Sequence, residues 1–140
     1  MVQKKMSKSE LSDLSRINLS DDKDSIINKI KKAKTDPLPL PGSVDELNKR
    51  PEAKNLLGIY SSLTNSTLDK SVNEFSGKKF SEFKEKLSQV LVEKINPISQ
   101  EIKKLINDKG FLDKILSDGH KKANNIASNK VKKMQDIIGF

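Results

Sequence analysis

The residues with the clearest chemical potential lie together near the start of the sequence, in the stretch KKMSKSE at positions 4–10. Lys5 and Lys8 supply two ammonium groups, and Ser7 and Ser9 place hydroxyl donors beside them. Ammonium groups on flexible stems act as point charges for phosphate, and small serines let the backbone come near it. These residue types therefore favour a mobile loop that binds a negatively charged group. The alternative interpretation is a solvated basic arm, because a lysine run is usually an exposed surface.

The composition excludes several other kinds of chemistry. The chain has 140 residues, no cysteine and a single histidine, His120. Disulfides, thiolate catalysis and histidine-rich metal sites are therefore excluded, and we expect no metal site built by the protein. Lysine and arginine number 27 against 19 acidic residues, so contact with a polyanion is expected. Only Arg16 and Arg50 are arginines, so contact with a nucleic acid would be mainly to its backbone.

Targeting signals are not visible in the sequence. No apolar run approaches the roughly 18 residues of a membrane span. The charged N-terminus is not followed by the apolar stretch of about 7–15 residues that marks a signal peptide. We therefore expect a cytoplasmic protein with no membrane partner.

Apolar residues recur at spacings of three and four, which predicts helices. Ile26, Ile27 and Ile30 indicate a helix over 21–34, with Ser20 as its N-cap and acidic residues in its first turn. The proline-rich stretch TDPLPLPGS at 35–43 then predicts an extended linker. Its only acidic residue, Asp36, is expected to serve as a capping or turn residue.

Further helices are predicted along the rest of the chain. One begins near Pro51 and carries Asn55 as a buried amide and Tyr60 as a phenol near the surface. A short helix over 67–75 is expected to be capped by Ser66. The longest pattern covers 80–106, where Pro97 predicts one kinked helix or two in series. Helices over 111–117 and 118–138 complete the chain, with His120 exposed.

These patterns favour one fold class. No segment shows the strict alternation of a half-buried strand, and no Asn-Gly hairpin signal is present. The predicted fold is all-α, a small irregular helical bundle with a flexible basic N-terminal loop.

The motif near the start of the chain, together with later segments, resembles a known protein family. KMSKS at residues 5–9 is the nucleotide-loop signature of class I aminoacyl-tRNA synthetases. Three later segments resemble, in order and spacing, the C-terminal part of bacterial tryptophanyl-tRNA synthetases: NLLGIYSSL at 55–63, FSGKKFSEFKEKLSQVLVEKINPI at 75–98 and LSDGHKKANNIASNKVKKMQDIIGF at 116–140. The resemblance covers almost the whole chain. It does not include the nucleotide-binding Rossmann half, with its HIGH-type signature and tryptophan pocket.

The resemblance implies roles for the residues of the motif. Lys5 and Lys8 would be catalytic, stabilising charge that grows on the pyrophosphate, with Lys8 the stronger contact. Met6 would anchor the loop by packing, and Ser7 and Ser9 would add donors, so that residues 5–9 together bind ATP. ATP would be a substrate, and its phosphates would hold Mg²⁺.

The resemblance also implies a division of the chain and a set of partners. Residues 1–19 would form the KMSKS loop and connection, at the end of the catalytic domain, and 20–140 a helical domain that binds the anticodon arm. The parent enzyme would be a homodimer that activates tryptophan with ATP and transfers it to tRNA(Trp), whereas the isolated chain is expected to be inactive. Candidate tRNA contacts are Arg50, Lys121, Lys122, Lys130, Lys132 and Lys133, although a solvated helix face explains the lysines equally well.

Two other functions remain open. A stand-alone, non-enzymatic helical module derived from a synthetase would bind tRNA or a protein partner. A general helical nucleic-acid binder would share only the positive charge, and the ordered match over several segments argues against it. A Rossmann half encoded in frame upstream of Met1 would distinguish a synthetase from a stand-alone module.

Overall fold

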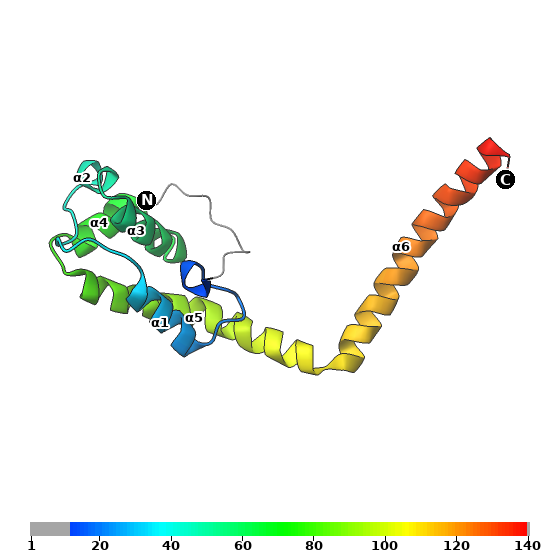
Figure 1. Ribbon diagram of the computed structural model, residues 1–140, viewed down its shortest axis with the longest axis horizontal. Helices are drawn as coiled ribbons and strands as arrows, with labels where there is room; N and C mark the ends of the chain where they lie inside the picture. The colour runs from blue at the N-terminus through cyan, green and yellow to red at the C-terminus, as the bar shows by residue number, and fades with distance from the viewer. Residues whose placement is uncertain (1–11, 140) are drawn as a thin grey trace. The chain divides into compact units, whose positions relative to one another are not determined.

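The computed structural model describes residues 12–139, and the motif at 5–9 lies outside them. The described residues are mostly helical and contain no strand, so the all-α prediction is confirmed for this part of the chain. Figure 1 shows the elements in chain order. They are η1 (Asp13–Ser15), α1 (Lys23–Lys32), α2 (Val44–Asn48), α3 (Pro51–Leu63), α4 (Leu68–Phe75), α5 (Phe80–Asn107) and α6 (Lys109–Ile138).

The chain divides into two compact units between Gln100 and Glu101. The first unit contains η1, α1 to α4 and most of α5, and the second contains the end of α5 and all of α6. This boundary separates two units that each make most of their contacts internally. It is not the boundary expected after residue 19, which divides the chain by function and stays a prediction.

The core of the first unit is aliphatic around three aromatic rings. Tyr60 and Phe75 meet edge to face with their ring centroids 4.9 Å apart, and Phe75 meets Phe83 at the same distance. Edge-to-face pairs of this kind add about 0.5–1.5 kcal/mol beyond the area that they bury. Aliphatic side chains from all five helices of the unit pack around the rings, among them Ile26, Ile30, Leu47, Leu56, Leu57, Val72, Leu87 and Leu91.

Two predicted helix caps are wrong, because a residue one or two positions further along the chain supplies the capping oxygen. The N-cap of α1 is Asp22, whose carboxylate accepts a hydrogen bond from Ser25 N at 2.9 Å. Ser20 instead precedes the residue that closes a turn, in which Asp21 N donates to Asn18 O at 3.0 Å. The N-cap of α4 is Thr67.

The predicted helix bounds also need correction in three places. α5 is one continuous helix with Pro97 inside it, so two helices in series is wrong. α6 is likewise a single helix through Gly119, where two helices were predicted, and Asp108 caps it by accepting from Phe111 N at 3.0 Å. The five-residue helix α2 was not predicted. Its N-cap, Ser43, accepts a hydrogen bond from Glu46 N.

The second unit is dominated by α6, whose described side chains are exposed apart from the half-buried Leu112. Its apolar residues recur at helical spacing, and many of them are exposed, including Phe111, Ile115, Ile126, Val131, Met134 and Ile138. Across residues 12–139, no helix combines the length and the apolar character that crossing a membrane requires.

Candidate functional site

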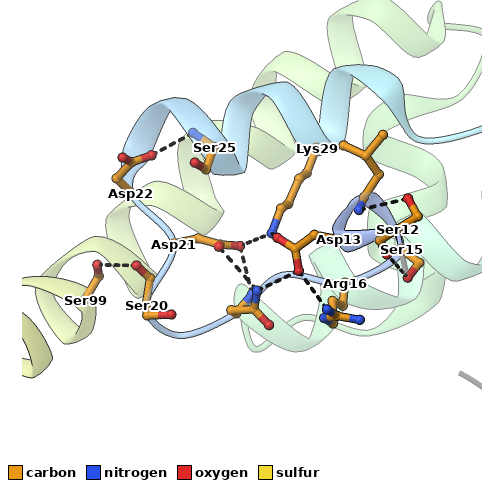
Figure 2. A network of polar contacts seen from close by, with 12 residues as sticks. Ser12, Asp13, Ser15, Arg16, Ser20, Asp21, Asp22, Ser25, Lys29 and Ser99 are labelled. Carbon is orange, nitrogen blue, oxygen red and sulfur yellow. Dashed lines mark hydrogen bonds and ion pairs between the residues drawn. The ribbon is translucent and has the colours of Figure 1, made fainter. Parts of the chain in front are cut away.

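The predicted ATP-binding residues Lys5, Met6, Ser7, Lys8 and Ser9 lie outside the described residues, so their roles stay predictions. The described chain begins at Ser12, three residues beyond Ser9. It enters at once a set of polar contacts that fixes the connection between the motif and α1 (Figure 2).

The centre of these contacts is Lys29, on the inner face of α1 between Ile26 and Ile30. Its side chain is only 7% exposed. The ammonium Nζ donates to Asp13 Oδ2 at 2.5 Å and to Asp21 Oδ2 at 2.6 Å. A buried ammonium requires such carboxylate partners, because leaving water without them is costly.

Arg16 and Asn18 complete this set of contacts. We call the set the Lys29 network, and its members are Asp13, Arg16, Asn18, Asp21 and Lys29. Arg16 Nη2 lies 3.1 Å from Asp13 Oδ1. Asn18 donates its backbone N–H to Asp21 at 2.8 Å and its side-chain amide to Asp13 at 3.0 Å. The two carboxylates are thereby held in place from several directions, as Figure 2 shows.

The network is arranged to keep its charges. Burial disfavours the charged form of Lys29, but hydrogen bonds to Asp13 and Asp21 outweigh burial and raise the pKa of this lysine. The hydrogen bonds from Lys29 and Asn18 lower the pKa of Asp13. Lys29 and Asp13 are therefore both ionised at neutral pH.

A contact from α5 holds the same connection. Ser99, whose side chain is 1% exposed, donates its hydroxyl to Ser20 O at 3.2 Å, across 79 residues of sequence. The connection that precedes α1 is thus tied to both α1 and α5.

A second ion pair fixes the proline-rich linker after α1. Arg50 donates Nε to Asp36 Oδ2 at 3.0 Å and Nη2 to Asp36 Oδ1 at 2.5 Å. The guanidinium also donates to the carbonyl oxygens of Pro39 and Leu38, at 2.6 and 3.1 Å.

Asp36 has the turn role expected for it, since it accepts from Leu38 N at 3.0 Å, but its pairing with Arg50 was not predicted. The contact of Arg50 with tRNA stays a prediction. These bonds use most of the donors of its guanidinium.

The five lysines predicted to contact tRNA on α6 are all exposed. They do not form one patch, because residues of a helix share a face only at suitable spacings. Lys121 and Lys132 are eleven residues apart, about three turns, and share a face with Lys114, which was not predicted. Lys122 and Lys133 form a second pair at the same spacing on the neighbouring flank. Lys130 lies four residues from both Ile126 and Met134, within the apolar stripe.

The structure also tests the burial predicted for Tyr60, Asn55 and His120. Tyr60 is buried, at 4% exposure, and its hydroxyl donates to Glu74 at 3.1 Å, so a phenol near the surface is wrong. Asn55 is exposed, so the predicted buried amide is also wrong, because Leu56 and Leu57 supply the buried face of α3. His120 is exposed as expected.

A groove of about 930 Å³ lies between α1 and α5. Nothing in the sequence predicted it. Ile27, Phe80 and Val92 supply apolar walls, and Lys23 and Lys31 contribute charge. Lys84, which also lines the groove, donates its Nζ to Ala33 O at 2.6 Å and to Lys31 O at 3.2 Å, two carbonyls at the C-terminal end of α1. Burial lowers the pKa of Lys84.

Comparison with known proteins identifies the class. Residues 2–98 match the family described as tRNA synthetases class I (W and Y), and the chain belongs to this family. The similar proteins described below are tryptophan–tRNA ligases, which confirms the resemblance noted from the motifs. The chain is 50% identical to the tryptophan–tRNA ligase of Agrobacterium fabrum over 137 residues, covering 98% of the chain and 39% of that enzyme.

Other relatives give the same result. The tryptophan–tRNA ligase of Brucella melitensis is 47% identical, with 98% of the chain and 39% of that enzyme covered. The ligase of Rickettsia felis is also 47% identical, with 98% and 41% covered. The chain thus spans about two fifths of the length of the curated relatives that it matches.

Proposed function

We propose that residues 1–140 form the C-terminal part of a tryptophan–tRNA ligase that makes tryptophanyl-adenylate from tryptophan and ATP and transfers the tryptophan to tRNA(Trp). The observation that carries this proposal is the 50% identity to such a ligase across 98% of the chain. The KMSKS motif at 5–9 falls inside the family match at 2–98.

In this proposal, the motif serves the activation step. The carboxylate of tryptophan attacks the α-phosphorus of ATP, and negative charge grows on the departing pyrophosphate. Lys8 and Lys5 neutralise that charge, and Ser7 and Ser9 donate hydrogen bonds to the phosphates. Met6 holds the loop by packing.

Mg²⁺ enters this scheme with ATP. Residues 12–139 contain no group of three or more aspartate, glutamate, histidine or cysteine side chains that could hold a metal ion. The described residues therefore do not fit a protein cage for the ion, and we propose that the ATP phosphates hold it.

The helical residues 20–140 serve tRNA(Trp) in this proposal. The lysine pairs of α6, 121 with 132 and 122 with 133, are exposed and suited to phosphate. Lys130 and Arg50 complete the proposed set. The enzyme acts as a homodimer.

A stand-alone helical module that binds tRNA is the second candidate, favoured by the same exposed lysines. The two candidates differ in what the 140 residues do when joined to a catalytic half. A chimaera can supply that half if residues 1–140 replace the matching part of the Agrobacterium fabrum enzyme.

Tryptophan-dependent exchange of pyrophosphate into ATP tests the proposal. The chimaera should catalyse this exchange, and a polypeptide of the 140 residues alone should not. A folded chimaera that binds tryptophan and lacks exchange would overturn the ligase proposal. Tight binding of tRNA(Trp) by the same inactive chimaera would favour the module.

A further inference from the structure

The Lys29 network holds a point of the chain that is close in sequence to the motif. Asp13 follows Ser9 by four residues, and four residues of chain span at most about 14 Å. Asp13 is therefore a fixed point of the described chain that lies close to the motif in sequence. We propose that Lys29 is a positioning residue for tryptophan activation, acting through Asp13 to fix the backbone from which the KMSKS motif extends. This inference rests on the proposed function.

The contacts converge on the connection from several elements. α1 supplies Lys29, and η1 supplies Asp13, which receives the lysine at 2.5 Å. Asp21 holds the other side of the ammonium at 2.6 Å. α5 supplies Ser99, which binds Ser20 O. Residues 13–21 are thus fixed at both ends, and Figure 2 shows both sets of contacts in one view.

Stability alone does not explain a lysine at this position. Placing an ammonium and a carboxylate out of water is costly, and apolar replacements of buried ion pairs are often neutral or stabilising. An apolar side chain could occupy the same buried position 29 but could not hold the carboxylates of Asp13 and Asp21. What the lysine adds is a fixed position for Asp13 and Asp21.

The other ion pair of the same unit supplies a matched comparison. Asp36 and Arg50 also join two elements through charge-assisted hydrogen bonds. Asp36, however, lies 23 residues beyond Asp13 in the sequence and fixes the proline-rich linker. Loss of either ion pair weakens the unit, but only loss of the Lys29 network should release the residues next to the motif.

The test uses the chimaera with the Agrobacterium fabrum catalytic half and measures single-turnover formation of tryptophanyl-adenylate. Lys29→Met and Asp13→Asn should each lower the rate at saturating ATP by about tenfold or more, because small misplacements of a catalytic group are costly. The KM for tryptophan should change little. Lys29→Arg, which keeps the charge, should recover part of the rate. Asp36→Asn should lower the rate less than twofold.

Each result decides the inference. Should Lys29→Met fail to fold, Asp13→Asn carries the test, since Asp13 is 51% exposed and tolerates substitution better. Equal rate losses in Asp36→Asn and Asp13→Asn, at equal losses of thermal stability, would show a merely structural role. Unchanged rates in the Lys29 and Asp13 variants would also overturn the inference, while an active parent chimaera leaves the proposed function standing. A parent chimaera without adenylate formation would overturn both.

Discussion

Arg50 and Asp36, fourteen residues apart, face each other through two parallel hydrogen bonds, from Nε to Oδ2 at 3.0 Å and from Nη2 to Oδ1 at 2.5 Å. The same guanidinium lies 5.6 Å from the centre of the Phe80 ring at the start of α5. A flat guanidinium suits both a carboxylate and a ring face. The pair therefore joins the linker after α1 to the start of α3 and to α5.

Asp36→Asn should destabilise the 140-residue chain by about 1.5–3 kcal/mol, the usual contribution of hydrogen bonds to charged groups. Urea unfolding followed by circular dichroism measures this loss. Glu93→Gln removes an exposed carboxylate from α5 and serves as the control, with an expected change within about 0.5 kcal/mol. An Asp36→Asn variant as stable as the control would show that the pair contributes nothing net.

The same carboxylate should make stability depend on pH in acid. The Arg50 guanidinium beside Asp36 lowers the pKa of this carboxyl below its ordinary 3.8. A lowered pKa contributes stability that is present above 3.8 and is lost as pH falls through the pKa of the folded state. The difference in unfolding free energy between the parent chain and Asp36→Asn should therefore shrink below about pH 4. A difference that stays constant down to pH 2.5 would contradict this.

Tyr60 offers a direct spectroscopic test of the core. It is the only tyrosine of the chain, so absorbance near 295 nm follows its ionisation alone. Burial, with the hydrogen bond to Glu74, raises the pKa of this phenol above 10.0. Stability from the neutral phenol is thus present below pH 10.0 and is lost as pH rises through the folded pKa. In urea the same titration should return to about 10.

The two lysines of the motif should differ in the chimaera. Lys8→Ala should lower the rate of adenylate formation by about 10²–10³-fold, and Lys5→Ala by about an order of magnitude less. The affinity for ATP should fall far less than the rate in Lys8→Ala, because the contact forms mainly in the transition state. A raised dissociation constant for ATP with an unchanged rate would make Lys8 a ground-state contact only.

The lysines of α6 should affect tRNA binding in pairs. Double replacement of Lys121 and Lys132 by alanine should reduce the slope of log affinity against log salt by about 1–2, since each phosphate contact releases counterions. Replacing Lys122 and Lys133 should show whether the second flank takes part. The control replaces Lys54 and Lys70, two exposed lysines of the first unit, with the same change in charge. Equal slopes in all three variants would mean that net charge alone sets the affinity.

Apolar spacing predicted where the long helices lie, because Ile26, Leu57 and Phe83 are core residues at the expected faces. It could not predict that α6 continues through Gly110 and Gly119, because glycine usually weakens a helix and does not end this one. The family was readable from short motifs, but the roles of the motif residues were not tested by the described structure.

The sequence could not predict which charged residues form ion pairs, for a different reason. Lys29 has the same surroundings in sequence as the exposed Lys31 and Lys32, and only folding separates them. Arg50 was considered for contact with tRNA because arginine is rare in this chain. Its partner, Asp36, is fourteen residues away, and local patterns do not report pairs at that distance.

Lys84 has a consequence for how this sequence can change during descent. Its ammonium ends α1 from 51 positions away, by binding Ala33 O. Because the acceptor is a backbone carbonyl, a replacement of Ala33 keeps it, whereas a replacement of Lys84 removes the donor. The evolutionary constraint from this contact therefore falls on position 84 in α5, while the side chain at position 33 is free to change as far as this contact is concerned.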